Sequence, residues 1–224
     1  MMSVDMARKI AQFIKNNNII RLNVMGGEFF CNPDWFEILD LFIEAAPHIR
    51  LVSNSDWAHN EDVKSKLISL HEKYDQKFYV CLSNDEWHTN KYVSEAEEFL
   101  NSVGIRCYNG EGQLKRDGIV PVGRGELTGY GEFYSFMGAY CRNPEFEYSF
   151  LIDEDGNIYK CAFGTWKYAN VDDYVDGGFE KRFKEYNAEV KNIFIPNCLS
   201  CRRSCERYNR TKEVDNERIV IKCE

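Results

Sequence analysis

Apolar and polar positions along the first half of the chain follow helical and strand periods in turn. Residues 4–17 place apolar side chains at helical spacing, so we expect an amphipathic helix there. An apolar run at 19–25 then predicts a strand. The Asn-Pro-Asp triplet at 32–34 should open a second helix, because these residue types favour a cap, a first helical position and the positive helix end. Pro47 should stop it.

The same alternation continues to about residue 110. Further elements are expected as strands at 49–53, 78–82 and 105–108, and as helices at 61–74 and 95–103. Strands that alternate with helices of this length are typical of a parallel sheet, with functional groups at the carboxyl ends of the strands. About four such units are too few for an eight-unit barrel. The sequence therefore predicts an α/β fold, with an incomplete, open parallel β/α barrel over residues 1–130.

The second half of the chain has a different pattern. Glycines are frequent over residues 112–131, which predicts an irregular, turn-rich stretch. Apolar runs at 148–152 and 157–160 flank the sequence Asp-Glu-Asp-Gly, a strong hairpin signal because the Asp-Gly pair tolerates positive φ. A short helix is expected at 179–190.

Composition and charge narrow the class of protein. Hydrophobic residues make up 44% and aromatic residues 14%, as in globular proteins. A net charge of −8 argues against a nucleic-acid binder, which needs clustered Lys and Arg. No apolar stretch approaches the roughly 20 residues that span a bilayer. Asp5, Arg8 and Lys9 interrupt any signal-peptide pattern, so we expect a cytoplasmic, reducing location without a membrane partner.

Nine cysteines in a reducing compartment indicate metal or redox chemistry rather than disulfides. Cys31, Cys81 and Cys107 are isolated, and we expect them to be small buried hydrophobes. Six candidate metal ligands follow residue 140: Cys141, Cys161, Cys198, Cys201, Cys205 and Cys223. The predicted hairpin brings the second of these back toward the first. The C-x2-C-x3-C run can place thiolates on one metal, although four thiolates suit zinc and iron–sulfur clusters equally.

The spacing Cys141-x14-Gly156-x4-Cys161, followed by Cys198-x2-Cys201, resembles the SPASM or twitch domain of radical S-adenosylmethionine (radical SAM) enzymes. That resemblance implies a 4Fe–4S cluster. In the twitch arrangement these four cysteines are its ligands.

A competing ligand set resides entirely at the end of the chain: Cys198, Cys201, Cys205 and Cys223. A full SPASM pattern has one more cysteine, at a position that resembles Asn209, so one cluster fits better than two. The resemblance thus implies a small cysteine-rich SPASM/twitch-like module over residues 131–224.

The first half of the chain resembles the same family. The Gly-Gly-Glu sequence at 26–28 ends a strand and is similar to the family's GGEP segment, which meets the amino group of S-adenosylmethionine; Phe29 replaces the proline. The Ser-Asn-Asp sequence at 83–85 resembles a signature near the ribose and carboxylate of that cofactor. The resemblance therefore implies a cofactor site at Gly26, Gly27, Glu28, Ser53, Asn54, Ser83 and Asp85.

One family motif is missing from these 224 residues: the C-x3-C-x2-C loop whose cluster reduces S-adenosylmethionine. We therefore expect an N-terminally truncated radical SAM enzyme, whose parent forms a 5′-deoxyadenosyl radical to modify a peptide or small-molecule substrate. Activity would require the missing segment, supplied for example by a second polypeptide. The alternatives are a non-catalytic cluster-binding or electron-transfer partner and a structural zinc-binding α/β protein.

Overall fold

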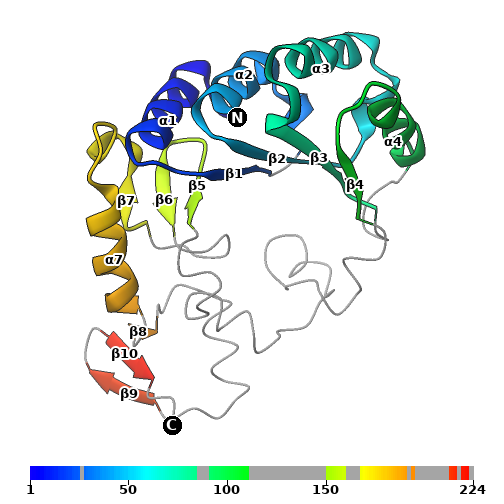
Figure 1. Ribbon diagram of the computed structural model, residues 1–224. Helices are drawn as coiled ribbons and strands as arrows, with labels where there is room; N and C mark the ends of the chain where they lie inside the picture. Colours follow the sequence, from blue (N-terminus) through cyan, green and yellow to red (C-terminus); the bar gives the residue numbers. More distant parts are fainter. Residues whose placement is uncertain are drawn as a thin grey trace. The chain divides into compact units, whose positions relative to one another are not determined.

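The computed structural model describes eight segments of the chain, residues 1–25, 28–84, 91–110, 150–159, 167–190, 193–194, 212–215 and 218–221. The chain divides into two compact units, Met1–Lys115 and Arg116–Glu224 (Figure 1). The boundary predicted at residue 130 lies outside the described segments and stays a prediction. Within the described segments, no helix has both the length and the apolar character needed to cross a membrane.

Strands and helices alternate through the first unit. With η denoting a short 3₁₀ helix, its elements are α1 (Val4–Asn16), β1 (Arg21–Val24), η1 (Phe29–Cys31), α2 (Trp35–Ala45), β2 (His48–Ser53), η2 (Asp56–His59), α3 (Glu61–Tyr74), η3 (Asp75–Lys77), β3 (Phe78–Leu82), α4 (Val93–Ser102) and β4 (Cys107–Asn109). The strands form one parallel sheet in the order β1-β2-β3-β4. The predicted α/β fold with a parallel sheet is therefore confirmed.

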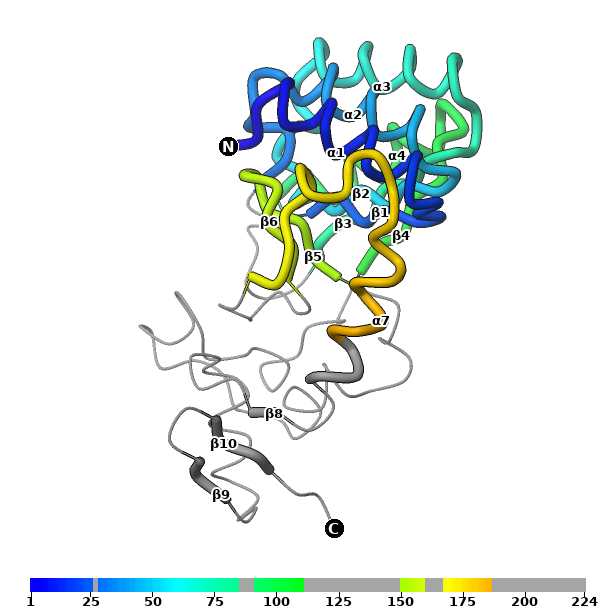
Figure 2. The backbone as a smooth tube through the Cα atoms, turned by 90° about the vertical axis from the view of Figure 1, so that its left-hand side faces the viewer, coloured from blue at the N-terminus to red at the C-terminus, as the bar shows by residue number. Residues whose placement is uncertain are grey.

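The two faces of this sheet have different surroundings. Figures 1 and 2 show α1 to α4 gathered on one side of the strands. Ile49, Leu51 and Val80 point to that side and are fully buried. Alternate positions, such as Arg50 and Tyr79, point to the other side and remain partly exposed. We call this other side the open face.

The start of α2 differs from its prediction. Asp34 occupies the N-cap, and the helix begins at Trp35 rather than at Pro33. Asn32 lies earlier, in a turn in which its Oδ1 accepts a hydrogen bond from the Asp34 amide at 3.0 Å and its Nδ2 donates to the Met2 carbonyl at 2.9 Å. Asn32 lies two residues before the N-cap, so its contact with the Asp34 amide forms a turn ahead of the helix rather than the expected cap.

The expectation that the isolated cysteines are buried is wrong. Cys31 is exposed on η1, and Cys81 and Cys107 are partly exposed. Cys81 lies on the open face, where it accepts a hydrogen bond from Arg50, and Cys107 lies on β4, the last strand of the sheet order.

The second unit holds short antiparallel strands and one helix. Its described elements are β5 (Leu151–Ile152), β6 (Asn157–Tyr159), β7 (Ala169–Asn170), η6 (Val171–Asp173), α7 (Phe179–Val190), β8 (Ile193–Phe194), β9 (Lys212–Asp215) and β10 (Arg218–Ile221). β5 pairs antiparallel with β6, and Gly156 between them has φ 77°, which confirms the predicted hairpin. The Asp153 carboxylate stabilises the turn by accepting hydrogen bonds from the backbone amides of Asp155 and Asn157.

An aromatic cluster packs α7 within this unit. The rings of Tyr168 and Tyr186 stack with centroids 3.9 Å apart, and Phe179 contacts Phe150 at 5.0 Å. The observed helix, Phe179–Val190, has the predicted bounds. Its apolar residues therefore have a core of their own within the second unit.

Candidate functional site

Three of the predicted cofactor-binding residues lie together at the carboxyl edge of the parallel sheet. Glu28 follows β1, while Ser53 ends β2 and Asn54 follows it. The Ser53 hydroxyl donates a hydrogen bond to Glu28 Oε1 at 3.0 Å, and the backbone amide of Asn54 donates one to Oε2 at 2.8 Å. The Phe30 amide lies 3.4 Å from Oε1. The end of β1 is thus joined to the end of β2 through a single carboxylate.

Ser53 is buried at 2% exposure, and all of its hydrogen-bonding positions are in use. Besides donating to Glu28, its hydroxyl accepts hydrogen bonds from the Trp57 indole at 2.9 Å and from the Ser55 amide at 3.0 Å. A hydroxyl offers one donor and two acceptor positions. Ser53 therefore positions the Glu28 carboxylate.

Burial raises the pKa of Glu28 above its ordinary value, although hydrogen bonds from Asn54, Ser53 and Phe30 oppose the increase; the nearby Asp56 carboxylate raises it further. Among the described residues, no Lys or Arg forms an ion pair with this carboxylate. A carboxylate can accept about four hydrogen bonds, and the described residues donate three to Glu28. A cation with N–H donors, such as an ammonium group, would therefore compensate the charge of the Glu28 carboxylate.

Polar residues also lie at the carboxyl ends of β3 and β4. The Ser83 amide donates to the Ser53 carbonyl at 2.8 Å. Beyond it, the Asn84 amide donates to Asn109 Oδ1 at 2.9 Å, and Asn109 in turn donates to the Glu97 carboxylate at 2.9 Å. Ser83 thus lies next to Ser53. The side-chain amides of Asn84 and Asn109 connect the end of β3 to Glu97 on α4 by hydrogen bonds.

Some of these residues were not expected from the sequence. Asn109 ends the fourth strand, and the rule that functional groups follow parallel strands is the signal that points to it. Asp56 bonds reciprocally with Asn54 through its own amide and carboxylate, at 3.0 and 2.9 Å. Glu97 and Trp57 come from helices, and no sequence pattern marks either of them.

The remaining predicted site residues lie outside the described segments. They are Gly26, Gly27, Asp85, Cys141, Cys161, Cys198, Cys201, Cys205 and Cys223. Their roles stay predictions. Across the segments that are described, no three or more His, Cys, Asp or Glu side chains gather in a way that suits a metal ion.

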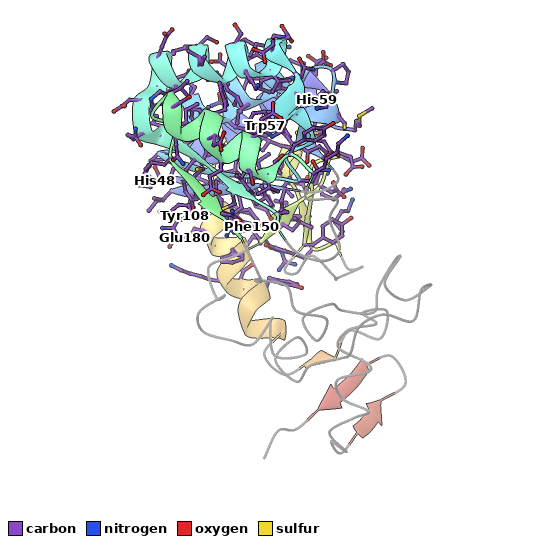
Figure 3. The ribbon with its side chains drawn as sticks, turned by 90° about the vertical axis from the view of Figure 1, so that its right-hand side faces the viewer. His48, Trp57, His59, Tyr108, Phe150 and Glu180 are labelled. Carbon is purple, nitrogen blue, oxygen red and sulfur yellow. The ribbon has the colours of Figure 1, made fainter. Side chains whose placement is uncertain are left out.

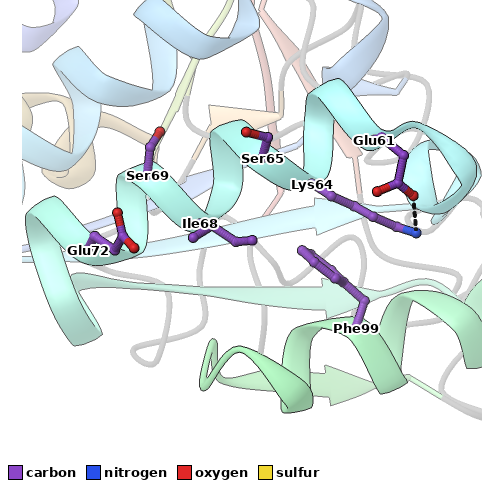
Figure 4. A pocket seen from close by; sticks show the side chains of 7 residues that line it. All are labelled: Glu61, Lys64, Ser65, Ile68, Ser69, Glu72 and Phe99. Atoms are coloured by element: carbon purple, nitrogen blue, oxygen red, sulfur yellow. Dashed lines mark hydrogen bonds and ion pairs between the residues drawn. The ribbon is translucent and has the colours of Figure 1, made fainter.

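A groove of about 420 Å³ is lined by residues of α3 and α4 (Figure 4). Lys64 borders it and pairs with Glu61 at 3.0 Å and with Glu95 at 3.3 Å. Its apolar lining comes from Ile68 and Phe99. Because Lys64 is already paired with two carboxylates, the lining of the groove offers no unpaired cation, and the strand ends, where several predicted site residues meet, are the better candidate site.

No family model matches this chain, and no curated protein matches it.

Proposed function

We propose that this chain is an iron–sulfur protein that holds a 4Fe–4S cluster, resembles a radical SAM enzyme and binds S-adenosylmethionine at the carboxyl edge of its parallel sheet. The observation that carries the proposal is the Glu28 carboxylate, fixed by Ser53 and Asn54 and lacking a cationic partner among the described residues. In the family that this chain resembles, the glutamate of the corresponding segment meets the amino group of that cofactor. The one-sided helical layer on the parallel strands further supports an open β/α barrel.

The residues at the strand ends have distinct proposed roles. Glu28 accepts hydrogen bonds from the cofactor's ammonium group, which compensates its partly buried charge. Ser53 and the Asn54 amide hold that carboxylate in place. Ser83 lies on the adjacent strand end, where the ribose is expected. In the enzymes that this chain resembles, the cofactor supplies a 5′-deoxyadenosyl radical for hydrogen abstraction.

The proposed cluster uses the cysteine thiolates of residues 131–224. The β5–β6 hairpin supports the twitch ligand set, because Leu151 pairs with Tyr159 and the chain after β6 returns to the side from which β5 came. Cys161 follows β6 by two residues in the sequence, and the proposal requires the segment that carries Cys141 to lie near it. The fold that the proposal requires is therefore an incomplete barrel with a SPASM/twitch-like module.

The absence of a C-x3-C-x2-C triplet from these residues favours a second candidate function. In that candidate, the chain binds its cluster and acts as an electron-transfer or binding partner without cleaving S-adenosylmethionine. Radical chemistry requires the triplet from a longer parent chain or from a second polypeptide. A structural zinc site is the remaining alternative, and it is distinguished by metal content.

Binding of S-adenosylmethionine by the anaerobically reconstituted full chain tests the proposed cofactor site. We expect Glu28→Gln to weaken binding roughly tenfold or more, because a hydrogen bond to a charged group contributes about 1.5–3 kcal/mol. Glu72→Gln makes the same chemical change on the exposed surface of α3 and should leave the affinity unchanged. Calorimetric titration measures both variants, and circular dichroism checks their folding.

The pH dependence of the same titration gives a second signature. Since the pKa of Glu28 is raised, lowering the pH from neutral protonates this group earlier than an ordinary glutamate. Wild-type affinity should therefore fall as the pH decreases, while the affinity of Glu28→Gln should stay flat. Equal affinity in the wild type and the Gln variant, or no binding to the wild type, contradicts the proposed site.

A further inference from the structure

The open face of the sheet presents cationic and aromatic side chains in one cross-strand row. In the parallel register, Asn23 pairs with Arg50, and Arg50 pairs with Tyr79. The Arg106 guanidinium lies 5.8 Å from the centre of the Tyr79 ring. Neighbouring strands are about 4.8 Å apart, so the row places two guanidinium groups on either side of one tyrosine.

Arg50 is the central residue of this row. Its side chain is partly buried, and its Nε donates a hydrogen bond to Cys81 Sγ at 3.1 Å. No carboxylate in the described part of the chain pairs with it. A guanidinium carries five N–H donors in a planar fork, and a cation withdrawn from water is costly unless an anion compensates it. Arg50 therefore has donors available for an anionic group.

The open face also differs in charge from the chain as a whole. The strand positions that point to it carry no acidic residue: Arg21, Asn23, His48, Arg50, Val52, Tyr79, Cys81 and Tyr108. The whole chain has a net charge of −8. These strand positions therefore contribute no negative charge beside Arg50, and the charge that they present to a ligand is positive.

Two tyrosines provide flat apolar surface next to Arg50. The rings of Tyr79 and Tyr108 meet edge to face, with centroids 5.3 Å apart. Tyr108 is 56% exposed. Figure 3 shows it on the side of the sheet away from the helices, whereas Trp57 lies within the helical layer. An aromatic or flat ligand body can contact these rings while its acidic group reaches the guanidinium.

We propose that the open face binds a small organic carboxylate, with Arg50 as the two-pronged anchor of the carboxylate group. Tyr79 and Tyr108 contact the body of the ligand, and Cys81 lies beside the anchor. This site requires neither a cluster nor S-adenosylmethionine, so it goes beyond the function proposed above. The guanidinium fork pairs with two oxygens of one acidic group, and the rings of Tyr79 and Tyr108 favour an organic carboxylate with an apolar body over inorganic phosphate, which has none.

Titration of the full chain with benzoate tests the anchor. The side-chain Nε–H signal of Arg50, assigned by its loss in Arg50→Lys, should shift in the nuclear magnetic resonance spectrum as benzoate is added. Arg50→Gln should raise the benzoate dissociation constant about tenfold or more, as expected for a lost charge-assisted pair. Arg8→Gln removes the same charge from the exposed surface of α1 and should leave the constant unchanged.

A thiol footprint keeps the proposal testable if Arg50→Gln fails to fold. In the wild-type chain, saturating benzoate should slow alkylation of Cys81 by iodoacetamide several-fold, while Cys31, exposed on η1, should react at its original rate. Peptide mass spectrometry resolves the two sites. Absence of protection at Cys81, or equal protection at Cys31, overturns the proposal. Inorganic phosphate that shifts the Arg50 signal when benzoate does not also overturns it.

Discussion

Replacing Cys161 with alanine will remove most of the iron that the anaerobically reconstituted chain retains, whereas replacing Cys205 will leave the iron in place. The reason is the twitch ligand set, in which Cys161 is one of four thiolates and Cys205 is not a member. A 4Fe–4S cluster needs a thiolate at each iron or another ligand in its place. Iron and sulfide are counted per chain after unbound metal has been removed.

The two variants also separate the competing ligand sets. Cys31→Ala is the matched control, since it removes one exposed thiol from the first unit and should not alter the iron count. Loss of iron in Cys205→Ala but not in Cys161→Ala selects the set at the end of the chain instead. If both variants retain their iron, neither of the two ligand sets is correct.

Ser53→Ala will lower the free energy of unfolding by about 3 kcal/mol, because two buried N–H donors and the Glu28 carboxylate each lose a partner. The affected donors are the Trp57 indole and the Ser55 amide. Urea unfolding followed by circular dichroism measures the change.

Ser69→Ala is the control for that substitution. The Ser69 hydroxyl donates to the Lys66 carbonyl on the exposed side of α3, so its loss should cost less than about 0.5 kcal/mol. A cost at Ser53 as small as the cost at Ser69 would show that the hydrogen bonds around Glu28 do not stabilise this edge of the sheet.

The periodic pattern of apolar residues and the capping residues predicted the helices and strands of the first unit well. The bounds of α3 and β3 agree with their predictions, and the Asn60 side chain caps α3 by accepting from the Asp62 and Val63 amides. α4 begins two residues earlier than expected, because the buried Val93 extends its apolar stripe. Long elements with clear caps are therefore predictable from local sequence.

Short strands were not predictable in the same way. β7 has two residues, which is too few to show an alternating period, and β9 has charged residues at three of its four positions. Their pairing depends on neighbouring strands rather than on their own sequence. The β5–β6 hairpin did carry a local signal, the Asp-Gly pair at 155–156, and the positive φ of Gly156 agrees with it.

The candidate site was predictable in location but not in contacts. Parallel strands bring their carboxyl ends to one edge, which is why Glu28 and Ser53 were expected near each other. The Trp57 indole reaches Ser53 because Ser55 adopts φ 72°, a conformation that a serine seldom takes and that its sequence does not reveal. The hydrogen-bond partners of Ser53 therefore required the structure.

Metal content of the anaerobically purified wild-type chain tests the proposed function most directly. We expect iron and acid-labile sulfide in equal amounts, at the level of one 4Fe–4S cluster per chain, with little zinc. Stoichiometric zinc without iron or sulfide would contradict the proposal and assign the cysteines to a structural site.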